Sequence, residues 1–214
     1  MAIGVNSAAQ LRNDSEGYSR IDFSYVAEKF NSSKSDISDL HTKGGSVAYV
    51  QGINLTTRIP LFVELGGNLT IAHGESKKSF VISDAYYERK LTMVDISVPF
   101  NIAYKIAFEN STVEIVPFFG PNFKFNVIGK MHENRQYPSS SEKTSYSFYK
   151  EDDMGDDKAQ RFQFGLNLGV GFHIGNCLYF GYHIRPDVSK YADIQSAGLK
   201  YRTFTQYMTL GIYL

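Results

Sequence analysis

The sequence has almost no cysteine, no tryptophan and no long apolar run. Its 214 residues include one cysteine, Cys177, which excludes an intrachain disulfide framework. No stretch approaches the roughly 20 consecutive apolar residues of a transmembrane helix. Basic and acidic residues both number 22 and mean hydropathy is −0.26, so charge gives no case for nucleic acid binding. A membrane-spanning β-barrel stays open, because each strand needs only about 9 to 11 residues, half of them polar.

What the sequence does have is a two-residue period, clearest over residues 160–185. Large apolar residues take every second position: Phe162, Phe164, Leu166, Leu168, Val170, Phe172 and Ile174, then Leu178, Phe180, Tyr182 and Ile184. Glycine, polar and ionisable residues fill the alternate positions. Gly175-Asn176 between the two runs suits a tight two-residue turn, so the pattern predicts a β-hairpin.

The composition of the two faces indicates where this hairpin lies. An unbroken apolar row fits a lipid-facing exterior, and small and polar residues fit the inside of a narrow barrel. The 16 phenylalanines and 15 tyrosines suit the aromatic girdles of such a barrel. A soluble lipocalin-like barrel carrying an apolar ligand is the rival interpretation.

The same alternation predicts further strands along the chain, near residues 18–28, 46–56, 61–71, 94–104, 114–127 and 207–214. Long polar segments follow the odd-numbered strands, at 31–44, 73–90, 129–159 and 186–198, and short turns follow the even-numbered ones. Outer-membrane barrels sort their connections in this way. We therefore expect an all-β, eight-stranded antiparallel up-and-down transmembrane β-barrel with short periplasmic turns and long extracellular loops, in a bacterial outer membrane.

Four residues interrupt the strand pattern. Gln51 stands among apolar residues, and Pro99, Pro117 and Pro121 lack the backbone N–H that a ladder uses. A closed barrel has no edge strand to hold a proline, so we expect β-bulges at these positions.

The N-terminus resembles the end of a signal peptide. Ser7 and Ala9 are small residues at the spacing that signal peptidase prefers, after the apolar Met1–Val5. We assign residues 1–9 to a signal-peptide remnant, 10–17 to a short lead-in and 18–214 to the barrel domain. A disordered N-terminus is the alternative.

Charged residues on the polar face predict a network inside the lumen. Its expected members are Asp22, Glu64, Asp95, Lys124, His183 and Arg185. Judged by distance from the short turns, Arg185 should pair with Asp22 or Glu64, and Asp95 with Lys124, because an unpaired interior charge is costly. Eight strands leave room only for side chains, which predicts a filled lumen without a permanent channel.

The loops and histidines offer further candidates. Asp152, Asp153, Asp156 and Asp157 could bind Ca²⁺ but lack the EF-hand register, so a solvated acidic loop is the default. The aromatics of the same segment, Tyr137, Tyr146, Phe148 and Tyr149, would either bind a partner or pack on the rim. His173 and His183 would serve a lipid A-modifying enzyme only beside a catalytic serine and carboxylate, and no such spacing occurs. We expect barrel-filling histidines, no enzyme activity and no cofactor.

Four motifs carry a family resemblance: VDISVPF at 94–100, PFFGP at 117–121, FGLNLGVG at 164–171 and TLGIYL at 209–214. Together they resemble the small outer-membrane β-barrel family of Bacteroidota, which includes porin-family and PorT-like members with OmpA/OmpX-like architecture. The chain departs from the usual terminal phenylalanine by ending at Leu214.

The resemblance implies a monomer in contact with outer-membrane lipid and lipopolysaccharide, inserted by the barrel-assembly machinery. We expect a structural role or a loop-mediated one toward an extracellular protein or glycan. The alternative is a transport or secretion accessory, narrow and porin-like or PorT-like.

Overall fold

The computed structural model describes residues 17–32, 40–56, 58–80, 85–108, 111–137, 140–150, 159–175, 177–194 and 199–214. Within these ranges no helix is long and apolar enough to cross a membrane. The strands are β1 (Tyr18–Ser32), β2 (Leu40–Asn54), β3 (Leu61–Phe80), β4 (Ala85–Tyr104), β5 (Ile106–Ala107), β6 (Val113–Tyr137), β7 (Ser140–Ser147), β8 (Phe162–Ile174), β9 (Leu178–Pro186), β10 (Ala192–Ile194) and β11 (Leu199–Tyr213). The expected signal-peptide remnant and nearly all of the lead-in lie outside the described residues.

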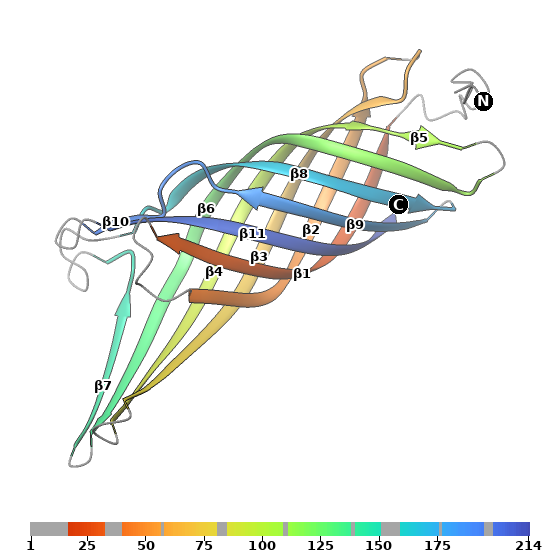
Figure 1. Cartoon of the computed structure of the whole chain (residues 1–214). Helices are drawn as coiled ribbons and strands as arrows, with labels where there is room; N and C mark the ends of the chain where they lie inside the picture. The colour runs from red at the N-terminus through yellow and green to blue at the C-terminus, as the bar shows by residue number, and fades with distance from the viewer. Residues whose placement is uncertain are drawn as a thin grey trace, which may run out of the picture.

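Eight of these strands form a closed antiparallel ring in the order β1-β2-β3-β4-β6-β8-β9-β11. Pairing of β1 with β11, from Arg20↔Tyr213 to Ser32↔Tyr201, closes the ring. Short β5 and the longer β7 pair with β6, and β10 pairs with β11. The predicted eight-stranded up-and-down barrel is confirmed (Figure 1).

The two faces of the ring differ as the alternation predicts. Outward apolar side chains remain exposed on every strand of the ring, for example Phe23, Leu69, Leu168 and Leu210. Inward positions are buried and mainly polar or small.

In the hairpin of β8 and β9, the last pair is Ile174↔Leu178, so three residues connect the strands and the predicted two-residue turn is wrong. Gly175 has a φ of 65°, a left-handed conformation that glycine adopts without strain.

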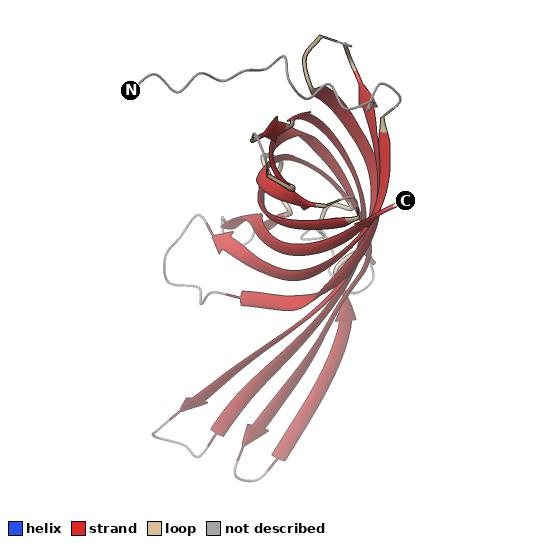
Figure 2. Cartoon of the chain, turned by 90° about the vertical axis from the view of Figure 1, so that its right-hand side faces the viewer, coloured by secondary structure: helices blue, strands red, loops and turns tan. Residues whose placement is uncertain are grey.

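Two of the predicted long loops are largely strand. β3 and β4 pair without a break in register as far as Phe80↔Ala85, which places most of the predicted loop 73–90 in the sheet. Likewise β6 runs to Tyr137 and pairs with β7 from Tyr137↔Ser140 to Lys130↔Ser147. Strands β3, β4, β6 and β7 therefore continue past one end of the ring as a four-stranded projecting sheet, clearly seen in Figures 1 and 2.

The expected bulges are also misplaced. Pro99↔Asn122, Pro117↔Val170 and Pro121↔Leu166 all lie in register with their ladders, because a proline omits one N–H without requiring an extra residue. Gln51 pairs with Ser19 and Leu65 in unbroken register. Its side-chain oxygen accepts hydrogen bonds from the Ser19 and Tyr49 hydroxyls, at 3.0 and 2.9 Å, so it is satisfied on the outer face.

A register shift does occur between β4 and β6, at the rim where the projecting sheet leaves the barrel. Val94 pairs with Ile128 and Asp95 with Asn126, so Val127 is an extra residue of β6. Val127 and Ile128 are both exposed, each at 38%. Beyond them, β6 turns its even-numbered side chains outward and its odd-numbered ones inward.

Candidate functional site

One group of charges fills the turn end of the lumen, which is the end where the short turns, such as the one between β8 and β9, connect the strands. The Arg20 guanidinium contacts Asp22 and Glu64, each at 2.9 Å, and all three side chains are buried. Arg20 also lies over the Tyr179 ring, 3.8 Å from its centroid. Because every buried charge has an opposite charge beside it, the desolvation penalty is offset.

A second group fills the lumen nearer the projecting sheet. The Lys124 ammonium lies 3.0 Å from Glu28 and 2.7 Å from Asp187, and it donates to the Thr203 hydroxyl at 3.1 Å. Arg185 lies 3.9 Å from Asp95 and donates to the Ser97 hydroxyl at 3.0 Å.

The ion pairs differ from the predicted ones. Arg185 contacts neither Asp22 nor Glu64, which pair with Arg20, and Lys124 pairs with Glu28 and Asp187 instead of Asp95. The reason is the stagger of the strands. Residue Asp22 is level with Gly211 and hence with Tyr179, whereas Arg185 is level with Thr205 and hence with Glu28. Distance from the turns does not measure depth in a sheared barrel.

Three charged members of these groups are absent from the predicted network. Arg20 and Glu28 share the parity of Asp22 on the first strand, and that signal could have included them. Asp187 lies in the segment predicted as a loop, where no alternation exists. It enters the lumen through a bridge to Gly165, a position at which a β-carbon would clash with the Asp187 carboxylate.

A cavity of about 50 Å³ lies in the lumen, lined by members of both charge groups. Arg20, Asn68, Asn122, His183 and Arg185 are among its lining residues. This space is less than twice the volume of about 30 Å³ that one water takes in the liquid. Buried side chains surround this cavity in the described part of the lumen.

The two histidines of interest occupy different sites. His183 stacks on Tyr207, with ring centroids 4.2 Å apart, and contacts the edge of Phe118. His173 lies at the turn end, where its ring Nδ1 is 2.7 Å from Glu114. Both rings contact residues of the barrel interior or its turn-end rim, so neither faces the surrounding lipid.

Three of the four candidate aromatics pack at the mouth of the barrel. Phe148 and Tyr149 contact a buried apolar cluster that includes Phe30 and Tyr191, and Tyr146 joins them while donating to Glu133 at 2.9 Å. The hydroxyls of Tyr149 and Tyr191, in the connections outside the barrel wall, are 3.2 Å apart. Burial raises the pKa of both phenols above its ordinary value. Tyr137 differs, because it is 47% exposed at the end of β6.

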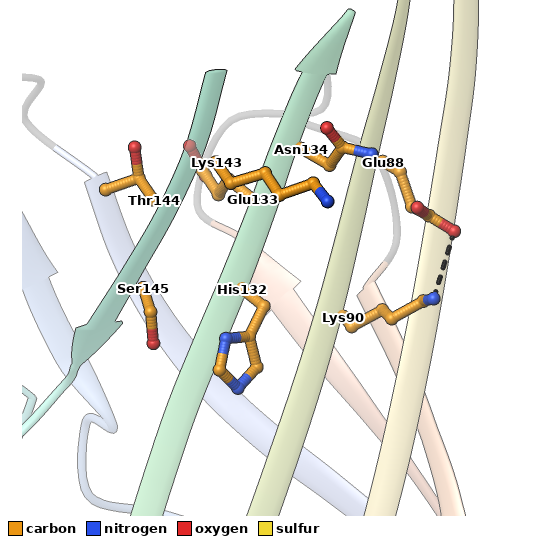
Figure 3. Close-up of a pocket in the computed structure, with 8 residues that line it drawn as sticks. All are labelled: Glu88, Lys90, His132, Glu133, Asn134, Lys143, Thr144 and Ser145. Atoms are coloured by element: carbon orange, nitrogen blue, oxygen red, sulfur yellow. Dashed lines mark ion pairs between the residues drawn. The ribbon is translucent and has the colours of Figure 1, made fainter. Parts of the chain in front are cut away.

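The projecting sheet has a polar outer side. The apolar band ends with Ile71, Val94 and Ile128, and the next outward row is Lys43, His73, Thr92 and Lys130, neighbours across β2, β3, β4 and β6. A pocket of about 300 Å³ lies farther out (Figure 3). It is lined by Glu88, Lys90, His132, Glu133, Asn134, Lys143, Thr144 and Ser145 from β4, β6 and β7.

The calcium candidates Asp152, Asp153, Asp156 and Asp157 lie outside the described residues. Among the residues that the structure does describe, no group of three or more histidine, cysteine or acidic side chains is arranged to hold a metal ion.

The fold has counterparts among known proteins. A family model for the outer membrane protein beta-barrel domain matches residues 2–190. Ail, the attachment invasion locus protein of Yersinia pestis, is similar at 14% identity, covering 93% of this chain and 99% of Ail, with a TM-score of 0.45. Neisserial surface protein A gives 12% identity, 92% and 96% coverage and a TM-score of 0.41. A major outer membrane protein from Thermus thermophilus gives 14% identity, 91% and 99% coverage and a TM-score of 0.43.

No curated protein matches the chain. The family match nevertheless spans most of the sequence, and it agrees with the closed ring and the lipid-facing apolar band described above. The chain belongs to the outer membrane protein beta-barrel domain family and is a β-barrel protein of the bacterial outer membrane.

Proposed function

We propose that this protein is a non-enzymatic interaction protein whose projecting sheet binds an extracellular protein or glycan. The observation that carries the proposal is the contrast between a packed lumen and a sheet that continues beyond the apolar band. The described lumen holds a cavity of only about 50 Å³ and many buried side chains. The sheet places polar side chains and strand edges outside the membrane, where a partner can reach them.

The edges of the projecting sheet supply a binding mode. β2 pairs with β3 only as far as Lys43↔His73, so in the described structure β3 beyond that point pairs with β4 alone. β7 pairs with β6 alone. Each edge presents backbone N–H and C=O groups to which an extended segment of a partner can add a strand. Exposed Tyr137, near the tip, adds an aromatic contact of the kind that is common in interfaces.

The test is a trimmed barrel. Joining Glu75 to Lys90 and His132 to Ser145 by Asn-Gly turns uses two existing cross-strand pairs and removes the outer sheet. Cells carrying the full chain and the trimmed barrel at equal surface levels would be compared for adhesion to arrays of extracellular matrix proteins and glycans. We expect adhesion to at least one array member by the full chain and its loss on trimming. Equal adhesion by both forms would contradict the proposal.

Conductance separates this proposal from the transport alternative. In a planar lipid bilayer we expect the purified barrel to give no steady single-channel current, because side chains fill its lumen. A reproducible current would favour the narrow porin-like role. A PorT-like secretion role would instead require a partner within the cell envelope, found by cross-linking from the same sheet edges. Membership of a Bacteroidota subgroup and insertion by the barrel-assembly machinery are parts of this proposal.

A further inference from the structure

The outer side of the barrel becomes basic where the apolar band ends, although the whole chain is neutral. Lys43 and Lys130 lie in the first outward row beyond the band, beside His73 and Thr92. The following rows carry Glu75, Lys90, His132 and Ser145, then Glu88, Asn134 and Lys143. Among the side chains that the structure describes, four lysines therefore face outward here with two glutamates, on the same side as the membrane-facing apolar residues.

These lysines differ in whether they have an ion-pair partner. Lys90 pairs with Glu88 at 3.3 Å, as Figure 3 shows. Within the described ranges, no carboxylate lies within ion-pair distance of Lys43, Lys130 or Lys143. All four lysines are exposed. The ammonium groups of Lys43, Lys130 and Lys143 can attract an anion, and hydroxyls of Thr144 and Ser145 in the adjoining pocket can donate to one.

The distance of this row from the apolar band indicates which anion it would bind. His73 and Lys130 are each two residues beyond the last apolar neighbour on their strands, Ile71 and Ile128, about 7 Å at the usual rise per residue, and Lys43 pairs with His73 at the same level. That distance corresponds to the headgroup layer of the leaflet that touches the band. At the opposite end, the outward apolar residues continue past Gln51 of β2 to Ile53 and Leu55.

We propose that Lys43, Lys90, Lys130 and Lys143 form a binding site for the phosphate groups of a phosphorylated glycolipid in the outer leaflet. The acyl chains of that lipid would lie against the apolar band, continuous with the row, and its phosphorylated sugars would reach the pocket on β4, β6 and β7. This site does not depend on the extracellular partner proposed above.

The experiment measures protection of the folded barrel in mixed detergent micelles. The probe is diphosphorylated lipid A. A folded barrel is expected to migrate in an SDS gel as a compact band, faster than the unfolded chain, and the readout is the rate at which this compact gel band disappears on heating. Phosphate-free lipid A and inorganic phosphate are the comparison ligands. The test variant replaces all four lysines by glutamine, a matched variant replaces them by arginine, and Arg58→Gln removes an exposed charge at the turn end.

We expect lipid A to slow unfolding of the native barrel at low salt. The glutamine variant should need at least about tenfold more lipid A for the same protection, since a juxtamembrane cation contributes up to about fivefold per charge. The arginine variant and Arg58→Gln should behave like the native protein. Equal protection of the glutamine variant, or equal protection by phosphate-free lipid A or by inorganic phosphate, would overturn the lipid site. The trimmed barrel keeps Lys43, Lys90 and Lys130, so it should keep most of the effect even if the adhesion proposal fails.

Discussion

Ion pairs occur both in the lumen and in the projecting sheet, but their side chains differ in how much of their surface is exposed. Lys124 and Glu28 are 3.0 Å apart with side chains 0% and 4% exposed. Arg89 and Glu133 in the projecting sheet are also 3.0 Å apart, but the Arg89 side chain is 38% exposed. Equal distances therefore do not mean equal energies. Inside, removal of Lys124 leaves Glu28 and Asp187 buried without their cation. In the projecting sheet, Glu133 is 7% exposed but keeps its contacts to Arg135 and the Tyr146 hydroxyl when the partly exposed Arg89 is removed.

The largest expected effect comes from breaking the inner pair. Lys124→Met leaves Glu28 and Asp187 buried without their cation, which should lower the free energy of unfolding by about 3–5 kcal/mol. Urea unfolding in lipid vesicles measures this loss. The exposed Lys150→Met is the control and should change stability by less than about 0.5 kcal/mol. Similar urea midpoints for both variants would show that the lumen charges are hydrated and exchangeable.

A charge on the apolar band should cost somewhat less. Leu210 is 57% exposed on the outer face of β11, between the exposed Met208 and Ile212, and Leu210→Arg should destabilise the barrel in a bilayer by about 2–4 kcal/mol. Thr92→Arg, in the first row beyond the band, should cost about 0–1 kcal/mol. Folding titrations in vesicles give both values. If the two variants cost the same, the boundary of the band lies elsewhere.

Breaking the outer pair should have a small effect. Arg89→Gln removes one partly exposed contact to Glu133, which keeps Arg135 at 3.2 Å and the Tyr146 hydroxyl at 2.9 Å. We expect a loss of about 0–1 kcal/mol by the same urea assay. A loss as large as that of Lys124→Met would mean that the projecting sheet is part of the cooperative core.

Trimming the sheet should leave the barrel itself intact. The ring of eight strands closes through β1 and β11 without the outer parts of β3, β4, β6 and β7. The trimmed chain should therefore migrate faster in an SDS gel when it is unboiled than when it is boiled, as expected of a closed barrel. Failure to show that compact band, in a protein that still expresses and binds detergent, would indicate that the sheet is needed to form the barrel.

The sequence predicted those features that depend on a two-residue period. The hydrophobic alternation of 162–174 coincides with β8 as the structure has it. It also indicated which side chains point inward, Arg185 among them. Partners across the lumen depend on the stagger between strands, which no single strand encodes, and this is why Arg185 was matched with the wrong carboxylates.

The projecting sheet escaped prediction for another reason. Beyond Gly74 and before Leu91 both faces of β3 and β4 carry polar residues, so the hydrophobic period that marks a strand disappears. Those residues are held as strands by pairing with neighbours, a long-range property. Asp187 was missed in the same way, since a loop residue has no alternation to show that it enters the lumen.

The extra residue at Val127 has a consequence for the exchange of parts between barrels of this kind. It acts as a phase change: every side chain of β6 above it has the opposite odd-even assignment from those below. A hairpin joined to β6 after Ile128 would follow the altered odd-even assignment. Its lysines would then lie on the same side as the membrane-facing residues. The same hairpin joined below Val127, without the extra residue, would turn its basic side toward the mouth of the barrel. The projecting sheet can therefore be exchanged between barrels only at a junction that takes the extra residue Val127 into account.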